Sequence, residues 1–254
     1  MTEVVLLPRA YGAYRGRILE TVRSHVNSLA SELDVELSKI GTNQKNHIVL
    51  SLSGSDEEFL TNLLDMEYSL VPEVQTILPE SNYPGFVVDS GKVGYGLYVD
   101  LGIEEPKMDA LIPLHRLREQ LGMNQESLRR IVDTFVLVDN LPVEIKIDSI
   151  SRDEQKIEAE LTSSFIERIE SWVSDDHERL LVLGSTKKMI EISLSQTKHM
   201  EDIYQIERLG FFEYSLVCKR STRATGIISA VGPRLRGVPM HLFIPSEVEE
   251  KRRA

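Results

Sequence analysis

The sequence predicts an α+β protein with three folded parts: a ferredoxin-like N-terminal domain, a five-stranded OB-fold β-barrel and an α+β C-terminal domain. Two observations favour this class. Helical and alternating apolar patterns are mixed up to Pro79, whereas the patterns after Pro84 and Gly85 are typical of strands. The length of 254 residues is also sufficient for more than one domain. The expected boundaries are 1–83 for the first domain, 84–163 for the barrel, 164–178 for an acidic linker helix and 179–254 for the last domain.

The N-terminal part has the pattern β-α-β-β-α-β, which is the ferredoxin-like split order. Ile18, Val22 and Val26 recur at helical spacing and predict the first helix. Ser55 and Glu58 form a capping box, which predicts the start of the second helix. The expected elements are a strand over 4–7, a helix over 15–33, strands over 35–40 and 48–52, a helix from residue 55 and a strand over 74–78.

The middle part has five short strands, with one helix between the third and the fourth, which is the order of an OB fold. Val143, Ile145 and Ile147 alternate with charged residues, as expected of a strand that is buried on one face. The expected strands cover 86–93, 94–102, 109–114, 142–150 and 156–161, and the expected helix covers 121–132.

The last part is expected to be joined to the barrel by a helix over 165–173, in which Trp172 is a packing anchor. Its apolar patterns predict both strands and helices. The expected strands cover 180–183, 189–194 and 238–244, and the expected helices cover 200–217 and 226–235.

The charge balance excludes one class of function. The chain carries 29 Lys and Arg against 40 Asp and Glu, a net charge of −11, so its surface as a whole has the wrong sign to coat a nucleic acid. Residues 1–178 carry −16 of this charge, whereas residues 179–254 carry +5. A phosphate-bearing partner is therefore expected at the C-terminal end of the chain.

Cys218 is the only cysteine, which excludes an internal disulfide framework and fits a reducing compartment. Within its apolar run we expect it to be a small buried hydrophobe. The sequence begins with no basic segment followed by a long apolar core, and no stretch reaches the roughly 18 apolar residues of a membrane span. These features predict a cytoplasmic protein with no membrane partner.

Residues 85–161 resemble the RNA-binding OB domain first named from ribosomal protein S one. The resemblance rests on GKV (91–93), YGLYVDLG (95–102) and DALI (109–112), followed by the strands over 142–150 and 156–161. In that family two aromatic residues of the second strand lie on the open barrel face and stack on bases, and they correspond to Tyr95 and Tyr98. The sequence departs from the family in a shorter first hairpin, in Ala110 at a usual glycine and in Pro113 at a usual histidine. His115 can replace that histidine only if the third strand ends early.

The whole chain also resembles an archaeal family of unknown function with the same three parts. The segments that carry this resemblance are GYGLYVD (94–100), LIPLHRLREQL (111–121) and IERLG (206–210). The resemblance implies an archaeal source and a cytoplasmic setting, and it supplies no activity.

The first candidate site is the aromatic face of the barrel. Tyr95 and Tyr98, together with Lys92, Arg152 and Lys156, predict a surface on which bases of single-stranded RNA stack. In the alternative interpretation both tyrosines pack under the helix over 121–132, and the domain binds a protein or nothing.

The second candidate site is the stretch between Tyr214 and Ser246, which contains no Asp or Glu. Its cations are expected to neutralise phosphates. Thr225-Gly226 and Gly232-Pro233-Arg234 are interpreted as the starts of helices, whose free amides favour anions. In the alternative interpretation this stretch is a solvated basic face that docks onto the acidic domains of the same chain. The cations are Lys219, Arg220, Arg223, Arg234 and Arg236.

No cofactor or metal is expected, because the six histidines are scattered and neither a P-loop nor a G-x-G-x-x-G motif occurs. The acidic run 175–178 is interpreted as a solvated linker. We therefore expect a non-enzymatic protein that binds RNA or is part of an RNA machine, such as the ribosome or RNA polymerase. The alternatives are a protein-interaction adaptor of the translation or transcription apparatus without RNA affinity, and an uncharacterised nuclease or nucleotide enzyme.

Overall fold

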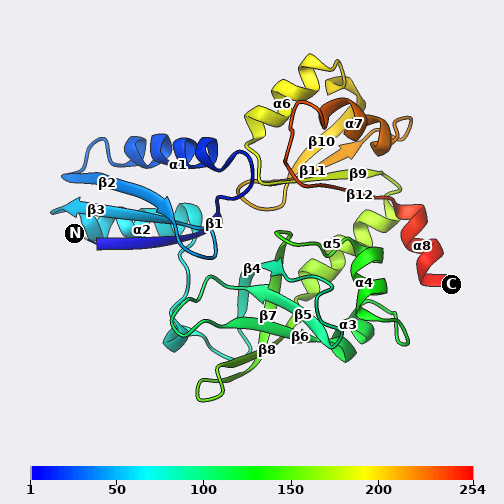
Figure 1. The fold of residues 1–254 in the computed structure, drawn as a ribbon, viewed down its shortest axis with the longest axis horizontal. Coiled ribbons are helices and arrows are strands. Elements are labelled where there is room, and N and C mark those ends of the chain that lie inside the picture. Colours follow the sequence, from blue (N-terminus) through cyan, green and yellow to red (C-terminus); the bar gives the residue numbers. More distant parts are fainter. Residues whose placement is uncertain (1, 254) are drawn as a thin grey trace.

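The computed structural model describes residues 2–253 and is a mixed α+β structure with three bodies that lie against one another (Figure 1). A three-stranded sheet with two helices forms the N-terminal body. A closed five-stranded barrel follows, and a four-stranded sheet with helices forms the C-terminal body. The chain therefore has the α+β composition and the central barrel that its sequence predicts.

The N-terminal sheet has the antiparallel order β1-β3-β2. Ile18, Val22 and Val26 of the first helix and Leu60 and Leu64 of the second pack into one core with the strands, because each set recurs every four residues and faces one side of its helix. The elements are β1 (Thr2–Arg9), α1 (Arg15–Leu29), β2 (Val35–Thr42), β3 (His47–Gly54) and α2 (Glu57–Tyr68).

The fourth strand expected over 74–78 is wrong. Val74–Thr76 is a short 3-10 helix, η1, and the chain reaches the edge of β1 only through an isolated bridge between Leu6 and Leu70. The physical reason is that Val74 and Ile77 are buried in the core of the barrel, not in that of the N-terminal sheet. These two apolar residues therefore stabilise the barrel and do not indicate a strand of the N-terminal sheet.

The barrel closes in the order β4-β5-β6-β8-β7, and β6 and β8 are its one parallel pair. The first strand, expected over 86–93, starts at Asn82 and ends at Val88, because Asp89 and Gly91 have φ angles of 53° and 77° and turn the chain. The strands are β4 (Asn82–Val88), β5 (Gly96–Asp100), β6 (Asp109–Pro113), β7 (Pro142–Ser151) and β8 (Lys156–Leu161).

The chain between β6 and β7 forms two helices where one is expected over 121–132, and only the second of them overlaps that range. They are α3 (Leu114–Gln120) and α4 (Leu128–Phe135). Gly122 has a φ of 69°, which ends the first helix, and the side chain of Ser127 accepts a hydrogen bond from the amide of Arg130 at the start of the second.

The C-terminal sheet has the antiparallel order β10-β11-β9-β12. All five residues of β9 are buried, because Leu180 and Val182 face one core and Leu181 faces another. Helices therefore cover both faces of this sheet (Figure 1). The elements are α5 (Ser163–Ser174), β9 (Arg179–Leu183), α6 (Lys187–Gln196), η2 (Met200–Asp202), β10 (Ile203–Arg208), β11 (Glu213–Cys218), α7 (Ala224–Val231), β12 (Met240–Phe243) and α8 (Pro245–Arg253).

Two predictions for this sheet are wrong. The segment expected as a strand over 189–194 lies in α6, where the side chain of Thr186 caps the helix by accepting from the amide of Met189. The segment expected as a helix over 200–217 contains the hairpin of β10 and β11. Its apolar spacing misleads because Ile203 is buried in the C-terminal core, whereas Phe212 is buried in the N-terminal one.

Helix α5 lies between the barrel and the C-terminal sheet. Its buried residues belong to one hydrophobic core that extends from the barrel to one face of that sheet. Trp172 is a packing anchor, as predicted: it is 4% exposed, and its ring meets that of Phe243 edge to face at 5.3 Å. The guanidinium of Arg179 lies over the same indole at 5.2 Å. The segment between barrel and sheet is thus a packed element.

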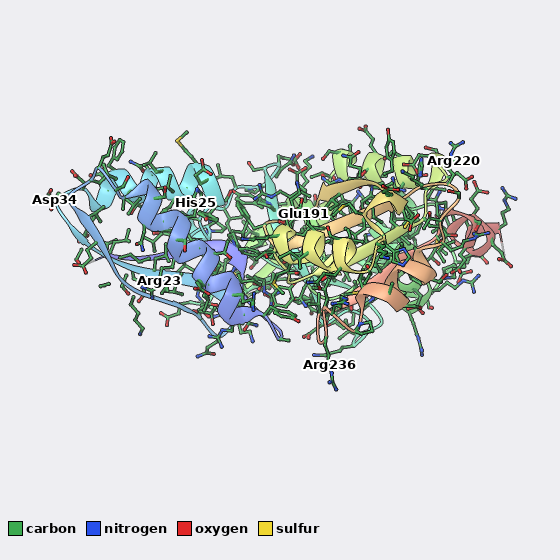
Figure 2. All side chains as sticks on the ribbon, turned by 90° about the horizontal axis from the view of Figure 1, so that it is seen from above. Arg23, His25, Asp34, Glu191, Arg220 and Arg236 are labelled. Atoms are coloured by element: carbon green, nitrogen blue, oxygen red, sulfur yellow. The ribbon has the colours of Figure 1, made fainter. Side chains whose placement is uncertain are left out.

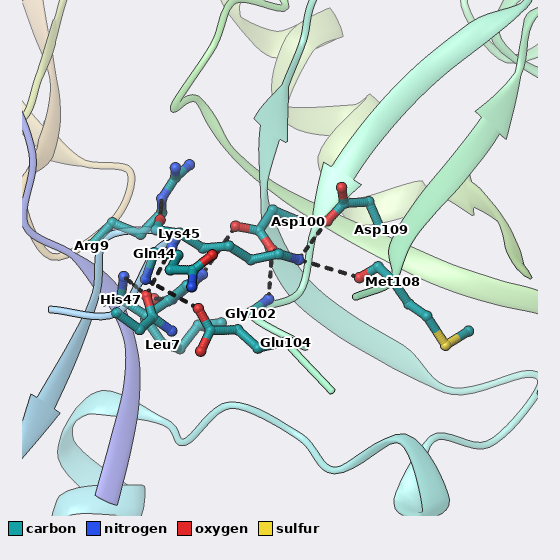
Figure 3. A network of polar contacts seen from close by, with 11 residues as sticks. Leu7, Arg9, Gln44, Lys45, His47, Asp100, Gly102, Glu104, Met108 and Asp109 are labelled. Carbon is teal, nitrogen blue, oxygen red and sulfur yellow. Dashed lines mark hydrogen bonds and ion pairs between the residues drawn. The ribbon is translucent and has the colours of Figure 1, made fainter. Parts of the chain in front are cut away.

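A buried ionic network joins the N-terminal body to the barrel (Figure 3). Lys45 Nζ lies 2.9 Å from a carboxylate oxygen of Asp100 and 2.7 Å from one of Asp109. Both ring nitrogens of His47 face acceptors, the Leu7 carbonyl at 2.6 Å and Asp100 Oδ2 at 3.1 Å, so the doubly protonated ring can donate to both.

The network determines the charge of Asp100, whose residue is 2% exposed. Burial alone raises the pKa of this carboxyl, but the hydrogen bond from His47 and the charges of His47 and Lys45 outweigh burial and hold the pKa well below its usual range. The carboxylate also accepts from the amide of Gly102 at 2.8 Å. A side chain at Gly102, where φ is 86°, would lie 2.4 Å from Val71.

The substitution Asp100→Asn is expected to lower the free energy of unfolding by roughly 3 kcal/mol near neutral pH, because the buried His47 loses its carboxylate partner and Lys45 keeps only Asp109. Urea denaturation measures the change. The matched control is Asp89→Asn, which removes an exposed ion pair with Lys92 and is expected to cost about 0.5 kcal/mol or less. Equal effects of the two substitutions would contradict the role assigned to the network.

Candidate functional site

The tyrosine platform, Tyr95 and Tyr98, lies on the outside of the barrel. Leu97 and Val99 of β5 point into the core, so Tyr98 between them points outward, and Tyr95 is 57% exposed. The two hydroxyl oxygens are 2.7 Å apart, and the rings meet edge to face with centroids 6.2 Å apart. The interpretation in which both tyrosines pack under the following helix is therefore wrong.

The platform continues across the neighbouring strands. Tyr98 lies beside Val88 of β4 and Leu111 of β6, and Leu111 lies beside Glu158 of β8. Val88, Tyr98 and Leu111 are all partly exposed. The hydrogen bond with Tyr95, together with burial, raises the pKa of Tyr98 to about 12. The phenol is therefore neutral in ordinary buffers and presents an uncharged ring.

His115 lies just after the end of β6. Strand β6 ends at Pro113 and α3 starts at Leu114, whose amide donates to the carbonyl of Tyr95 at 2.9 Å. His115 follows in the first turn of α3 and is exposed. The third strand thus ends early enough for His115 to lie near Tyr95.

The three cations predicted beside the tyrosines already have partners. Lys92 pairs with Asp89, and this hydrogen bond raises the pKa of Lys92. Lys156 pairs with Glu158. Arg152 donates to backbone carbonyls around η1, with the shortest distance, 3.3 Å, to Ile77. The platform is therefore apolar and aromatic. Its two lysines are neutralised by carboxylates, whereas Arg152 keeps its charge but is held by backbone carbonyls.

The five cations of the acid-free stretch fall into two groups at opposite ends of α7, a helix about 12 Å long. Lys219, Arg220 and Arg223 precede the helix, and Arg234 and Arg236 follow it. Figure 2 shows Arg220 and Arg236 well apart, with Arg236 extending away from the body of the protein. The stretch does not form one continuous patch.

The helix starts expected in this stretch are only partly right. Helix α7 begins at Ala224, but the carboxylate of Glu178 already accepts from the Ala224 amide at 2.7 Å and pairs with Arg223. Gly232 and Pro233 follow the end of α7 and start no helix. The anion site expected at the first position is thus occupied by a side chain of the chain itself.

The acidic run 175–178, expected to be a solvated linker, is anchored instead. Asp175 pairs with Arg179, a residue that is only 1% exposed, and Glu178 caps α7. The ring of His177 stacks on that of Tyr204 at 5.5 Å. Cys218 is fully buried, as predicted, and burial raises the pKa of its thiol to about 11.

The sequence did not reveal a cleft between the N-terminal and C-terminal bodies. Its volume is about 600 Å³, and α1 and α2 line one side while the start of α6 and the hairpin of β10 and β11 line the other. No motif marks it, because its residues are far apart in the sequence. The lining residues include His25, Glu67, Tyr68, Lys187, Lys188, Arg208, Phe211 and Tyr214.

Side chains from both bodies form a continuous row of contacts along this cleft. His25 Nδ1 lies 2.6 Å from the hydroxyl of Tyr68, and the ring of Tyr68 contacts that of Phe211 at 4.9 Å. The guanidinium of Arg208 lies 4.2 Å above the Phe211 ring. Burial raises the pKa of Tyr68 to about 12.

Glu213 is a fully buried acid where the bodies meet. It accepts hydrogen bonds from the hydroxyl of Tyr11 at 3.0 Å and from the amide of Phe212 at 3.1 Å. Burial raises the pKa of Glu213 to about 7, although these hydrogen bonds and the charges of Arg9 and Arg208 oppose the shift.

Comparison with protein families covers nearly the whole chain. Residues 3–73 match the DUF2110 N-terminal domain, residues 78–173 the DUF2110 central domain and residues 177–242 the DUF2110 C-terminal domain. The chain belongs to the DUF2110 family. The family is one of unknown function, as the sequence resemblance implied, so it supplies no activity. No curated protein matches the chain.

The DUF2110 matches follow the three bodies. The central one contains all five barrel strands, and the C-terminal one contains β9, β10 and β11 and ends within β12. Between Thr2 and Arg253, no helix is long and apolar enough to cross a membrane.

The substitution Glu213→Gln is expected to remove a pH dependence of stability. A carboxyl with a raised folded pKa binds its proton more tightly in the folded chain, so wild-type stability falls as pH rises from about 4.5 through 7. Between these pH values the free energy of unfolding of the variant, relative to that of the wild type, should rise by roughly 3 kcal/mol. Urea denaturation at several pH values measures it. Glu201→Gln, at an exposed acid, is the control, and parallel pH curves for wild type and Glu213→Gln would contradict the assignment.

Proposed function

We propose that this protein binds single-stranded RNA on the outer face of its barrel, with Tyr95 and Tyr98 stacking on bases. The observation that carries the proposal is the exposure of Tyr95, which is 57% exposed just before β5 and is hydrogen-bonded to the partly exposed Tyr98 of that strand. Aromatic stacking suits any base, because every base has a π face.

The proposal includes the assignment of an OB fold to the barrel and of a ferredoxin-like fold to the N-terminal body. The barrel order β4-β5-β6-β8-β7, with two helices between β6 and β7, is the strand order of an OB fold. The N-terminal order β-α-β-β-α, with the sheet β1-β3-β2, is that of a ferredoxin-like domain without its fourth strand. The OB assignment supports a barrel that is similar to the S-one-type RNA-binding domain.

Stacking is expected to supply most of the affinity at the platform. Lys92 and Lys156 are paired with carboxylates, and Arg152 is bound to carbonyls, so few free cations face the bases. His115 is exposed and follows Leu114, whose amide is bonded to the Tyr95 carbonyl, so we expect His115 to offer a polar contact to RNA.

Phosphates are expected to reach the two cations that follow α7. The guanidinium of Arg234 donates to the uncharged side-chain amide of Gln196 at 2.7 Å, so this hydrogen bond leaves its charge unneutralised. Arg236 is exposed. Both residues can therefore contribute charge to an RNA backbone that extends beyond the platform.

The cellular setting is part of the same proposal. We expect an archaeal, cytoplasmic protein without catalytic activity that is associated with RNA or with a machine such as the ribosome or RNA polymerase. The exposed stacking platform supports the association with RNA, and the single, buried cysteine is compatible with the cytoplasm.

A protein-interaction adaptor is the second candidate, and one observation favours it. Helix α2 exposes Phe59 and Met66, which are 55% and 85% exposed and lie seven residues apart on one face of the helix. An exposed apolar stripe on an acidic domain is typical of a protein contact.

The substitutions Tyr95→Ala and Tyr98→Ala are each expected to weaken binding of a single-stranded RNA of about 10 nucleotides by roughly 1–3 kcal/mol. The reason is the loss of one stacking surface. Fluorescence anisotropy at low salt measures the affinity. Phe59→Ala is the matched control, since Phe59 is as exposed as Tyr95 but lies on α2, and it should bind RNA normally.

Absence of RNA binding by the wild type at low salt would reject the RNA function and favour the adaptor. Normal binding by both tyrosine variants would reject the platform as the site.

The substitution Arg234→Glu is expected to weaken RNA binding and to reduce the salt dependence. The slope of log affinity against log salt should fall by about 0.7 for each phosphate that the protein no longer neutralises. Titrations at several salt concentrations measure the slope. Arg129→Glu makes the same charge change at an exposed site on α4 and should leave the slope unchanged. Equal slopes for wild type and Arg234→Glu would remove Arg234 from the interface.

A further inference from the structure

The interdomain cleft is a concave site that the RNA proposal does not use. At about 600 Å³ it has the size of a small-molecule site, and it lies where two bodies meet, a common location for such sites. Figure 2 shows the face of the molecule that carries α1, with His25 labelled, and α6, with Glu191 labelled. The walls come from both helices.

The charge of the cleft is opposite to that of the protein. Its walls carry Lys187, Lys188 and Arg208 but only one carboxylate, Glu67. Lys187 lies 3.7 Å from the half-buried Glu191. Lys188 and Arg208 have no carboxylate within ion-pair distance among the described residues. Like charges gathered in one cavity repel one another, and an anionic ligand would relieve that repulsion.

The Arg208 side chain is fixed in a way that suits a planar ligand. One side of its guanidinium lies over the Phe211 ring, and its Nε donates to the carbonyl of Gly210 at 3.1 Å. Phe211 is supported in turn by Tyr68. Arg208 is exposed, so the other side of the guanidinium is accessible, and nucleobases stack on such planes.

We propose that this cleft binds a nucleotide, with the base stacked on Arg208 and the phosphates held by Lys187 and Lys188. The cations of the cleft favour an anionic ligand, and the accessible guanidinium plane of Arg208 favours a ligand with an aromatic ring. A nucleotide has both features, whereas an acidic peptide has only the first. Thr21 and Thr186 also line the cleft and provide hydroxyl groups. The ligand is a free nucleotide or one unit of an RNA strand, which share this chemistry.

The test is calorimetric titration of the full chain with ATP, tripolyphosphate, adenosine and pentaadenylate. ATP should bind more tightly than either tripolyphosphate or adenosine, because each of these lacks one half of the recognised ligand. Lys188→Ala and Arg208→Gln should each weaken ATP binding by roughly tenfold or more, from the loss of a charge-assisted hydrogen bond. Thermal unfolding confirms that the variants are folded.

Arg23→Ala is the matched control, because Arg23 is an exposed cation of α1 outside the cleft lining, and it should bind ATP as the wild type does. Tyr98→Ala should also bind ATP normally, which separates this proposal from RNA binding at the platform. Pentaadenylate binding that is lost in Lys188→Ala and Arg208→Gln, without ATP binding, would identify the strand as the source of the nucleotide. Tripolyphosphate binding as tight as that of ATP, or no cleft-dependent binding of any probe, would overturn the proposal.

Discussion

The arrangement of this protein depends on one buried anion, the carboxylate of Asp100. It belongs to the barrel, yet its partners Lys45 and His47 come from the N-terminal body, so it fixes one body on the other. The cost of burying this carboxylate is offset by its contacts with Lys45 and His47. A second joint, at Trp172 and Arg179, connects α5 to the C-terminal sheet. Both joints together hold the two outer bodies at the spacing that leaves the interdomain cleft between them.

The electrostatics follow from this arrangement. A net charge of −11 describes the whole chain, but carboxylates such as Asp175 and Glu178 neutralise cations of the chain itself. The cations that keep no carboxylate partner therefore define where an external anion can bind. Of the described residues, Lys188 and Arg208 are such cations in the interdomain cleft, and Arg234 and Arg236 are such cations in the segment after α7. The tyrosine platform needs no such charge, because stacking does not depend on phosphate contacts.

The local patterns that predicted the barrel come from strands whose two faces differ, such as β7, where Val143 and Ile145 point inward between charged neighbours. Prediction failed where an apolar segment serves a neighbouring body. Ile77 has the apolar character of a strand in the first sheet but is buried in the barrel, and Phe212 completes a false helical pattern because it reaches the N-terminal core. The tyrosine platform could be predicted from one strand and a resemblance. The cleft could not, because contacts such as that of Tyr68 with Phe211 exist only after the bodies meet.

The central claim is that single-stranded RNA contacts the outer face of β5. Ultraviolet crosslinking of RNA containing 4-thiouridine, followed by mass spectrometry of tryptic peptides, tests it most directly. The account predicts that the crosslinked base is found on the peptide 93–107, which lies between Lys92 and Lys107 as cleavage sites and contains Tyr95 and Tyr98. Crosslinks that occur only on other peptides, with this one unmodified, would contradict it.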